Sequence, residues 1–393
     1  MTFSIVVHAG AGYHSPAAEE AYLAACRRAC EAARVRLLAG DGSLAAVTDA
    51  VAVLEDDPTC NAGTGSNLTL DGTVEGDASV MDAASRTWGG VAAVPLVPNP
   101  VRVAARIARD QFAAPPLSCG RVRPILLCGV GARSWAAEHG EPTLPEGSTA
   151  MVTPQARRLW RKYKGWVDGA QGEEAAETSA LDDDAGDGGG PAGRSSLEPG
   201  SLLHDTVGAV CCDGRGGMSA GVSSGGHWLK HPGRVGEAAA YGAGCWAEGG
   251  DDGASAFGVS VSGVGELIVQ DLVAKAVARA LGRGLEPSQG VLAALGGADA
   301  TYAGLVALVR AAAGSSAGTE VVWAHGTPSL AVAYLHHGIE APVAFVSRTA
   351  QGSAVVSGTF VRNHAQCGPQ PTEGGQPKVN RGRRKRGPLT EGS

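Results

Sequence analysis

Thr206 lies where a polar stretch gives way to an apolar one, in the run Leu203-His204-Asp205-Thr206-Val207-Gly208-Ala209-Val210. If the peptide bond before Thr206 is cut, this threonine becomes an N-terminus. Its hydroxyl is then a nucleophile, and its own α-amine, with a pKa of about 8, is a base that accepts the hydroxyl proton. This pair of groups predicts a hydrolase that uses an N-terminal threonine. The alternative is an ordinary threonine where a loop enters a strand.

The composition is that of a large apolar core built from small residues. Of the 393 residues, 44% are hydrophobic, only 5% are aromatic and 59 are glycine. We therefore expect a core of alanine, valine and leucine, with tight turns and close backbone approaches. The net charge of −7 gives no overall basic field, so nucleic acid is not an expected partner.

Targeting signals and cysteine usage indicate a soluble intracellular protein. No run of about 18 apolar residues occurs, and residues 1–4 lack the basic and apolar regions of a secretory signal, so no membrane partner is expected. The nine cysteines form an odd number without C-x-x-C spacing, which favours reduced, mostly buried thiols over disulfides or zinc. Cys211 and Cys212 are neighbours in a predicted strand and point to opposite faces, which disfavours a shared metal.

The elements that must position Thr206 begin with alternating helices and strands. An apolar strand at residues 4–8 runs into a glycine-rich turn, and Ser15-Pro16 then begins a helix that reaches about residue 38. Apolar residues at helical spacing predict further helices at 45–54, 101–110 and 131–139, and a strand is predicted at 90–97. Residues 1–168 therefore form one part of a mixed domain.

Residues 169–205 break this pattern and carry an acidic loop. Eight acidic residues and one base, Arg194, lie between Glu173 and Glu198, with glycine, alanine, serine and proline filling the gaps. Such a segment buries too little apolar surface to offset its ordering entropy, so we predict that it is disordered. A flexible segment that ends directly before Thr206 lets the new terminus move away after cleavage, which supports the nucleophile interpretation.

The part of the chain after Thr206 is rich in strands. Apolar runs separated by glycine turns predict strands at 206–212, 218–223, 241–246 and 257–261, then a helix at 266–281 and strands at 305–310, 330–335 and 343–347. Two antiparallel sheets with helices on both outer sides suit this order. We predict an α+β fold, a four-layer αββα sandwich in which residues 1–168 and 206–367 form one domain, followed by a disordered basic tail at 368–393.

Several motifs, in a fixed order, carry a resemblance to a known family. They are His8-Ala9-Gly10-Ala11-Gly12-Tyr13, Asn61-Ala62-Gly63-Thr64-Gly65-Ser66-Asn67, Asp77-Ala78-Ser79-Val80-Met81-Asp82, Asp205-Thr206-Val207-Gly208-Ala209-Val210, Val222-Ser223-Ser224-Gly225-Gly226, Lys230-His231-Pro232-Gly233-Arg234-Val235-Gly236, Gly244-Cys245-Trp246-Ala247-Glu248 and Ser260-Val261-Ser262-Gly263-Val264-Gly265-Glu266. With them the chain resembles the taspases, the threonine aspartase branch of the type 2 asparaginase family of N-terminal nucleophile hydrolases, over residues 3–165 and 201–367. The resemblance implies self-cleavage between Asp205 and Thr206 into an α/β heterodimer, which pairs into a dimer of heterodimers.

The resemblance also implies roles for individual residues. Thr206 is the nucleophile, and Ser224 hydrogen-bonds it and tunes its amine; a serine that only satisfies a turn is the alternative for Ser224. Ser262 and Gly263 fit an oxyanion hole, because glycine lets the backbone approach the developing charge. Arg234 binds the substrate carboxylate with two N–H groups of its guanidinium.

Three further residues bear on the substrate. Asp205 stands before the nucleophile where small-molecule asparaginases have glycine, which implies a protease that cuts protein substrates after an internal aspartate. Lys230, in a motif typical of the taspase branch, is a further substrate-binding candidate. Glu237 departs from that branch, which has an uncharged residue there. Since a carboxylate at this place can bind a free amine, isoaspartyl peptidase or L-asparaginase activity on small β-aspartyl substrates is the alternative.

No cofactor is implied, and one loop resembles a metal site. Residues 54–64 resemble the backbone loop that holds a structural sodium ion in asparaginases, with the candidate ligands Leu54, Glu55, Asp57, Cys60, Ala62 and Thr64. The glycine turns at 10–12 and 63–65 lack the phosphate-binding motifs, so nucleotide binding is not expected. We interpret His8, His204 and His231 as structural hydrogen-bonding residues rather than as bases.

The segment 378–386 near the C-terminus carries six basic residues and no acidic one. We interpret it as a nuclear import signal or a nucleic-acid contact, with a solvated tail as the alternative. A nuclear address suits the taspase resemblance, so the expected location is the nucleus and cytoplasm. A second basic cluster, at 157–164, is expected on a helix face. A non-enzymatic class also stays open, namely an unprocessed relative that binds partners through the acidic loop and the basic tail.

Overall fold

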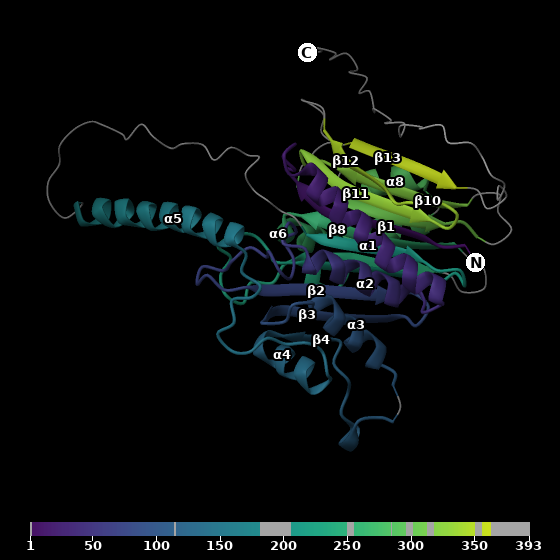
Figure 1. The fold of residues 1–393 in the computed structure, drawn as a ribbon, viewed down its shortest axis with the longest axis horizontal. Helices are drawn as coiled ribbons and strands as arrows, with labels where there is room; N and C mark the ends of the chain where they lie inside the picture. Colours follow the sequence, from purple (N-terminus) through teal and green to yellow (C-terminus); the bar gives the residue numbers. More distant parts are fainter. Residues whose placement is uncertain are drawn as a thin grey trace, which may run out of the picture.

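The computed structural model describes residues 2–113, 115–180, 206–249, 255–283, 285–295, 302–312, 318–349 and 356–362. Within these residues, two β-sheets stack face to face and helices cover both outer sides, as Figure 1 shows. The predicted α+β class and the four-layer αββα order are confirmed.

The first sheet takes strands from both sides of position 206. Its order is β12 (Val343–Arg348), β11 (Ser329–His336), β1 (Ser4–Gly12), β5 (Val207–Cys212), β6 (Met218–Ser224), β2 (Glu75–Asp82), β3 (Thr87–Pro95) and β4 (Leu126–Cys128). Neighbouring strands are antiparallel except β3 and β4, which are parallel. Because β1 pairs with both β5 and β11, segments before and after Thr206 share one sheet.

The second sheet is antiparallel throughout and comes entirely from the chain after Thr206. Its order is β13 (Val356–Arg362), β10 (Thr319–His325), β9 (Ala303–Arg310), β8 (Ala256–Gly263) and β7 (Cys245–Gly249). Strands β8 and β9 lie against β5 and β1 of the first sheet, which closes the inner layer of the sandwich.

Helices cover the two outer faces unequally. The first sheet is covered by α1 (Glu19–Ala39), α2 (Ser43–Asp56), α3 (Pro100–Asp110) and α4 (Gly129–Glu138). The second is covered by α7 (Val273–Gly282) and α8 (Pro287–Ala294), preceded by the short α6 (Gly265–Asp271). Two 3-10 turns, Ser118–Gly120 and Glu237–Ala239, lie in connecting segments. The long helix α5 (Pro154–Ala180) projects away from the sandwich in Figure 1.

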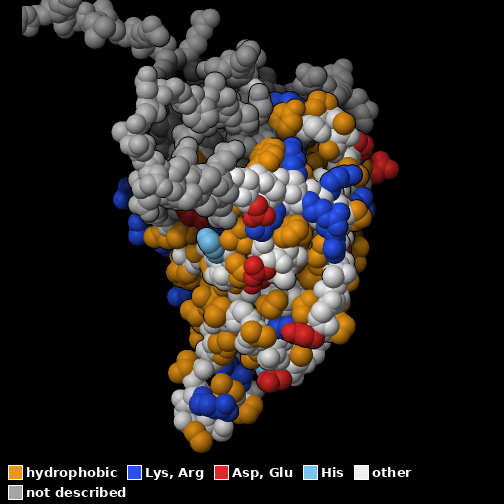
Figure 2. All heavy atoms as spheres, turned by 90° about the vertical axis from the view of Figure 1, so that its left-hand side faces the viewer, with side chains coloured by type: hydrophobic (Ala, Val, Ile, Leu, Met, Phe, Trp, Pro, Cys, Tyr) orange, Lys and Arg blue, Asp and Glu red, His pale blue; other side chains and the backbone are white. Residues whose placement is uncertain are grey.

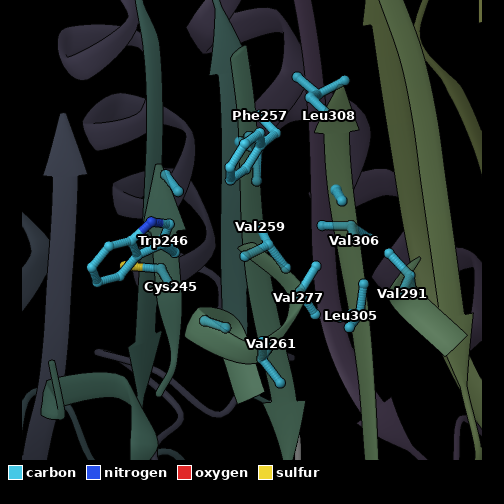
Figure 3. Packing of buried hydrophobic residues seen from close by; sticks show 14 of the residues in the cluster. Cys245, Trp246, Phe257, Val259, Val261, Val277, Val291, Leu305, Val306 and Leu308 are labelled. Atoms are coloured by element: carbon cyan, nitrogen blue, oxygen red, sulfur yellow. The ribbon is translucent and has the colours of Figure 1, made fainter. Parts of the chain in front are cut away.

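Alternating side chains of β5 enter two separate hydrophobic cores. Val207 and Ala209 pack with the helices of the first sheet, whereas Val210 packs between the two sheets. This follows because successive strand residues point to opposite faces. The cluster that contains Val210 extends to the helices that cover the second sheet, and Figure 3 shows side chains of β8 and β9 beside Val277 of α7 and Val291 of α8. Full burial of each such side chain stabilises the fold by about 1.5–3 kcal/mol.

The structure corrects two predicted elements after Thr206. The helix predicted at 266–281 is two helices, α6 and α7, because Leu272 between them has a left-handed φ of 47°. The apolar pattern continues across this break and gives no sign of it. The strand predicted at 241–246 starts late: residues 241–244 form a turn in which Gly242 has φ +82°, and β7 begins at Cys245.

Helix α5 corrects the predicted start of the acidic loop. It extends to Ala180, so residues 169–180, which we predicted to be disordered, are helical. Alanine, glutamine and glutamate fill most of residues 170–177, and these strong helix formers offset the glycines. The rest of the predicted loop, 181–205, and the tail at 368–393 lie outside the described residues, so both stay predictions. The basic cluster at 157–164 lies on α5.

The surface carries both charge signs. On the described part of the face in Figure 2, Lys and Arg (blue) and Asp and Glu (red) lie among hydrophobic side chains. Among the residues that the structure describes, no helix combines the length and the apolar character needed to cross a membrane. The eight described cysteines are free thiols, of which Cys119 and Cys128 are exposed and the others are buried.

Candidate active site

Thr206 and Ser224 lie opposite each other at the ends of adjacent strands. In the antiparallel pair of β5 and β6, Val207 lies opposite Ser223. The residues one position further along, Thr206 and Ser224, therefore also lie opposite each other. Asp77 of β2 lies opposite Ser224 on its other side. Since residues two positions apart share a face of a strand, Thr206 and Ser224 both point toward the second sheet. The pairing register therefore brings these side chains together.

The Thr206 hydroxyl is buried in a hydrogen-bonded group of three side chains. The residue is 2% exposed. Its Oγ1 lies 3.0 Å from Oγ of Ser224 and 2.5 Å from Oε1 of Glu237. The Ser224 oxygen also accepts a hydrogen bond of 3.0 Å from the backbone N–H of Gly226. The predicted nucleophile and its predicted partner thus contact each other, and Glu237 joins them.

Asn61 fixes the turn that follows Ser224. Its backbone carbonyl accepts a 2.8 Å hydrogen bond from the N–H of Gly225, and its Nδ2 donates to the carbonyl of Gly226 at 2.8 Å. Asn67 Nδ2 donates to the same carbonyl at 2.9 Å. A Cβ atom at position 225 would lie 2.5 Å from the Asn61 side-chain oxygen, so the turn requires glycine there.

A small cavity lies in front of Thr206. Its volume is about 10 Å³, which is room for roughly one water molecule. Five of the predicted site residues line it, namely Thr206, Ser224, Arg234, Glu237 and Gly263. The remaining wall is formed by Asn61, Gly226, His227 and Gly265.

Gly263 reaches this cavity, whereas the side chain of Ser262 points elsewhere. Gly263 has φ +147°, and a Cβ atom there would lie 2.1 Å from the carbonyl oxygen of Tyr302, so the position requires glycine. Ser262 Oγ accepts a 2.9 Å hydrogen bond from the N–H of Ala11 in β1. An oxyanion hole at these two residues stays a prediction, which now concerns their backbone alone.

Arg234 is oriented by Glu266 at the cavity wall. Its Nε and Nη2 donate to Oε1 of Glu266 at 2.9 and 2.8 Å, and its side chain is 14% exposed. A Cβ atom at Gly265 would lie 2.6 Å from Arg234 Nη2 and 2.5 Å from Glu237 Oε2. The absence of a side chain at Gly265 therefore lets both charged groups approach one place. A guanidinium so placed can bind a carboxylate.

Lys230 lies behind the cavity rather than in its wall. It is fully buried, and its Nζ donates to the backbone carbonyl of Glu75 at 2.6 Å. Asp77, whose charge attracts it, accepts a 2.8 Å hydrogen bond from the N–H of Gly236, the residue before Glu237. Burial lowers the pKa of Lys230 and raises the pKa of Asp77, and their mutual attraction opposes both shifts. Direct contact of Lys230 with substrate stays a prediction.

Burial dominates the titration of two groups near Thr206. It raises the pKa of Glu237, while the hydrogen bond from Thr206 and the charge of Arg234 act in the opposite direction. It also lowers the pKa of His8 to about 3, so this imidazole is neutral. His8 Nε2 lies 2.8 Å from Oγ of Ser260, which is the contact of a structural hydrogen-bonding residue.

The loop predicted to hold sodium is closed by its own hydrogen bonds. The carbonyl of Glu55 accepts from the N–H of Thr64 at 2.7 Å, that of Asp57 accepts from Cys60 at 3.0 Å, and that of Leu54 accepts from Asp57 at 3.3 Å. A carbonyl oxygen has two lone pairs, so each can still contact a cation. The sodium site stays a prediction. Among the described residues, no group of three or more His, Cys, Asp or Glu side chains is placed to hold a metal ion.

Sequence reasoning gave no role to four of the residues that line the cavity: Asn61, Gly226, His227 and Gly265. Asn61, Gly226 and Gly265 lie inside the motifs that carried the resemblance. The two glycines matter because other atoms approach them closely, which only the fold reveals. Asn61 hydrogen-bonds the backbone of Gly226, 165 positions away in sequence, and no local pattern shows such a contact. Of the other predicted residues, Asp205 and His204 lie outside the described residues.

Cavity size alone would have indicated a different place. A cavity of about 730 Å³ is lined in part by Trp88, Tyr241 and Trp246, with the Lys275 ammonium 3.5 Å from the centre of the Trp246 ring. None of the residues that we predicted for the site lines it. The contacts of Thr206, rather than volume, therefore locate the candidate active site.

Known proteins resemble this chain over most of its length. The sequence profile of a family described as asparaginase matches residues 1–337. An isoaspartyl peptidase of Salmonella typhimurium is 34% identical over 279 residues, 70% of this chain and 77% of that protein. A plant-type L-asparaginase of Pyrococcus abyssi is 33% identical over 278 residues, 69% of this chain and 77% of that protein. An isoaspartyl peptidase/L-asparaginase of Xenopus laevis is 30% identical over 291 residues, with shares of 74% and 80%.

The four-layer fold and the family match together define a hydrolase of the N-terminal nucleophile class. The chain belongs to the asparaginase family within that class. The resemblance to type 2 asparaginases that the sequence motifs carried is thereby confirmed for the family.

Proposed function

We propose that this hydrolase is a threonine endopeptidase, activated by self-cleavage between Asp205 and Thr206, that cuts protein substrates after an aspartate. The observation that carries the proposal is the buried Thr206 hydroxyl, which contacts Ser224 and Glu237 in the cavity that Arg234 also lines. Once the bond before Thr206 is cut, the same residue supplies both the nucleophile and its base.

Self-cleavage converts one chain into two subunits. Thr206 Oγ1 attacks the carbonyl carbon of Asp205, the peptide C–N bond breaks, and water opens the resulting ester. Residues 1–205 and 206–393 are then separate chains. In the mature site the Thr206 amine accepts the hydroxyl proton and the backbone at Ser262 and Gly263 stabilises the developing oxyanion.

The residue before the cleaved bond supports specificity for aspartate. If one pocket serves both reactions, Arg234 binds the side chain of Asp205 during self-cleavage and the aspartate of a substrate afterwards. An arginine held in place by Glu266 suits this task, because its planar guanidinium recognises a carboxylate with two parallel N–H groups.

A second candidate activity, isoaspartyl peptidase or L-asparaginase, is favoured by Glu237. Its buried carboxylate lies 2.5 Å from the Thr206 hydroxyl, and a carboxylate beside the nucleophile can bind a free amine of the substrate. The similar proteins from Salmonella typhimurium and Xenopus laevis are named for this activity. An internal aspartate presents no free amine, so the two activities require different partners for Glu237.

Self-cleavage is tested with the purified full-length chain. We expect two fragments on denaturing electrophoresis, the second beginning Thr-Val-Gly-Ala on N-terminal sequencing, and co-elution of both as a heterodimer under native conditions. T206A should remain one chain, because a methyl group cannot attack the carbonyl. A wild-type protein that folds by circular dichroism and yet stays uncut would refute the proposal and favour the unprocessed binding protein.

Two substrates separate the candidate activities of the cut protein. One is a peptide with a single internal aspartate, and the other is an isoaspartyl dipeptide. Mass spectrometry should find the peptide cut after its aspartate. Turnover of the dipeptide alone would assign the chain to the second candidate activity.

We also propose that the protein works in the nucleus and cytoplasm. The support is the basic segment 378–386, which lies outside the described residues. Fluorescence microscopy of a full-length fusion should show nuclear signal that falls when this segment is removed. Exclusion of the full-length fusion from the nucleus would contradict this location.

A further inference from the structure

In the uncut chain, Thr206 lacks the base that the mature enzyme would use. Its nitrogen belongs to the peptide bond with Asp205, and an amide nitrogen does not accept a proton near neutral pH. The first cut therefore requires another group to take the hydroxyl proton. This inference rests on the proposed function, because it concerns the same self-cleavage.

Glu237 is the ionisable side chain in contact with this hydroxyl. Within the part of the chain that the structure describes, Thr206 Oγ1 contacts Ser224 at 3.0 Å and Glu237 at 2.5 Å. The serine hydroxyl is too weak a base. Of the other ionisable groups near the cavity, His227 directs its Nδ1 at a backbone carbonyl oxygen 3.1 Å away, and Lys230 Nζ donates to another at 2.6 Å. Distance thus favours Glu237.

The charge of Glu237 decides how the Thr206 proton is arranged. The hydroxyl has one proton, which it donates either to Glu237 or to Ser224. An ionised Glu237 can only accept, so the hydroxyl donates to it. A protonated Glu237 donates to the hydroxyl oxygen and occupies one of its lone pairs. The ionised form alone can both orient the hydroxyl and remove its proton.

The backbone holds the carboxylate at this distance. Glu237 begins the 3-10 turn Glu237–Ala239, and the N–H of the preceding Gly236 donates to the buried Asp77 at 2.8 Å. The side chain fits because Gly265 has none: a Cβ atom there would lie 2.5 Å from Oε2 of Glu237. The carboxylate is therefore fixed within the reach that proton transfer requires.

We propose that Glu237 is the general base of self-cleavage. Its carboxylate takes the proton of Thr206 Oγ1 as this oxygen bonds to the carbonyl carbon of Asp205. The carboxylic acid so formed gives the proton to the Thr206 nitrogen as the C–N bond breaks, which leaves an ester and a free amine. Water then hydrolyses the ester, and the freed amine is the base for later substrates.

The proposal makes self-cleavage dependent on pH. Among the described residues, Arg234 and Lys230 favour the ionised form of Glu237, and Asp77 disfavours it. His227 also lines the cavity, and Glu266 is paired with Arg234. The rate should rise with pH as the carboxylate ionises. Since burial raises the pKa of Glu237, the cleavage rate should increase at pH values above 4.5, the ordinary pKa of glutamate.

The test follows self-cleavage of the full-length chain during cell-free synthesis at several pH values, with the two fragments quantified on denaturing gels. E237Q keeps an oxygen that can accept the Thr206 hydrogen bond but is no base. We expect it to be cut at least about 100-fold more slowly, the usual contribution of a general base, without the rise with pH. E20Q, which makes the same change at an exposed residue, should match wild type.

E237D guards against a folding defect. It keeps a carboxylate on a shorter side chain, so it should be cut more slowly than wild type and retain a rise with pH. Cutting of E237Q at the wild-type rate and with the wild-type pH profile would overturn the inference. If E237Q does not fold, a rate of E237D cutting that does not change with pH would overturn it instead. A wild-type chain that is never cut at Thr206 would instead refute the proposed function itself.

Discussion

If Arg234 binds the substrate carboxylate, as we propose, its guanidinium needs a fixed orientation, which Glu266 outside the cavity provides. Two of its N–H groups contact a single oxygen of Glu266, whose own side chain is 52% exposed. This contact fixes the plane of the guanidinium without filling the cavity. A lysine at the same position would keep the positive charge but lose the planar arrangement of donors, so the substitution separates geometry from charge.

We expect R234K to raise the KM for a peptide with an internal aspartate by roughly 30-fold, which corresponds to about 2 kcal/mol of lost binding. The value of kcat should change less, because the arginine binds a group that does not react. Steady-state kinetics of the cut enzyme measure both. R27K, at an exposed arginine paired with Glu20, is the matched control. An unchanged KM in R234K would show that the carboxylate binds elsewhere.

The strands that hold Thr206 were largely predictable, but their alignment was not. Apolar runs between glycine turns located β5 and β6 within one residue, since these strands are buried on both faces. Their register, which sets Thr206 opposite Ser224, depends on pairing across the sheet and leaves no trace in either strand. The sequence predicted Glu237 as a substrate-binding residue, but only the fold shows its contact with Thr206. Breaks such as Leu272 depend on backbone angles that side-chain patterns do not encode.

The turn at Gly225 should be intolerant of any side chain. We expect G225A to lower the free energy of unfolding by about 1–3 kcal/mol, because its Cβ would press on Asn61 and Ser66. The displaced turn should also shift Ser224 and slow self-cleavage. Urea unfolding in the T206A background, where the chain stays intact, measures the first effect, and gel analysis with Thr206 present measures the second.

The matched control is G131A in helix α4. A Cβ atom at this exposed glycine would meet nothing within 4 Å, so alanine there should leave self-cleavage unchanged and stabilise the helix slightly, by about 0.5 kcal/mol. Equal stability of G225A and G131A would mean that the turn can relax around a methyl group.

Buried titratable groups link the stability of the whole sandwich to pH in two directions. Burial lowers the pKa of His8 to about 3 and of His325 to about 4, so below the ordinary histidine value of 6.5 the unfolded chain binds more protons and acid destabilises the fold. Burial raises the pKa of Glu55 to about 8. Between pH 4.5 and about pH 8, Glu55 therefore holds its proton in the folded chain more than in the unfolded chain, and stability falls as pH rises. Asp77 and Glu237, whose pKa values burial also raises, act in the same direction as Glu55.

The contribution of Glu55 can be isolated with E55Q, compared with its parent in the T206A background. The amide oxygen can still accept the 2.9 Å hydrogen bond that Val101 N–H donates to Glu55 Oε1, but it does not ionise. The stability of E55Q relative to its parent should therefore rise by about 1.4 kcal/mol per pH unit between pH 5 and 7.5 and level off above 8. Urea unfolding at each pH provides the measurement. Any general effect of the substitution adds a constant at all pH values, and E20Q, at a side chain that is 76% exposed, should show a flat difference. A flat difference for E55Q as well would mean that the Glu55 carboxyl has the same pKa in the folded and unfolded chains.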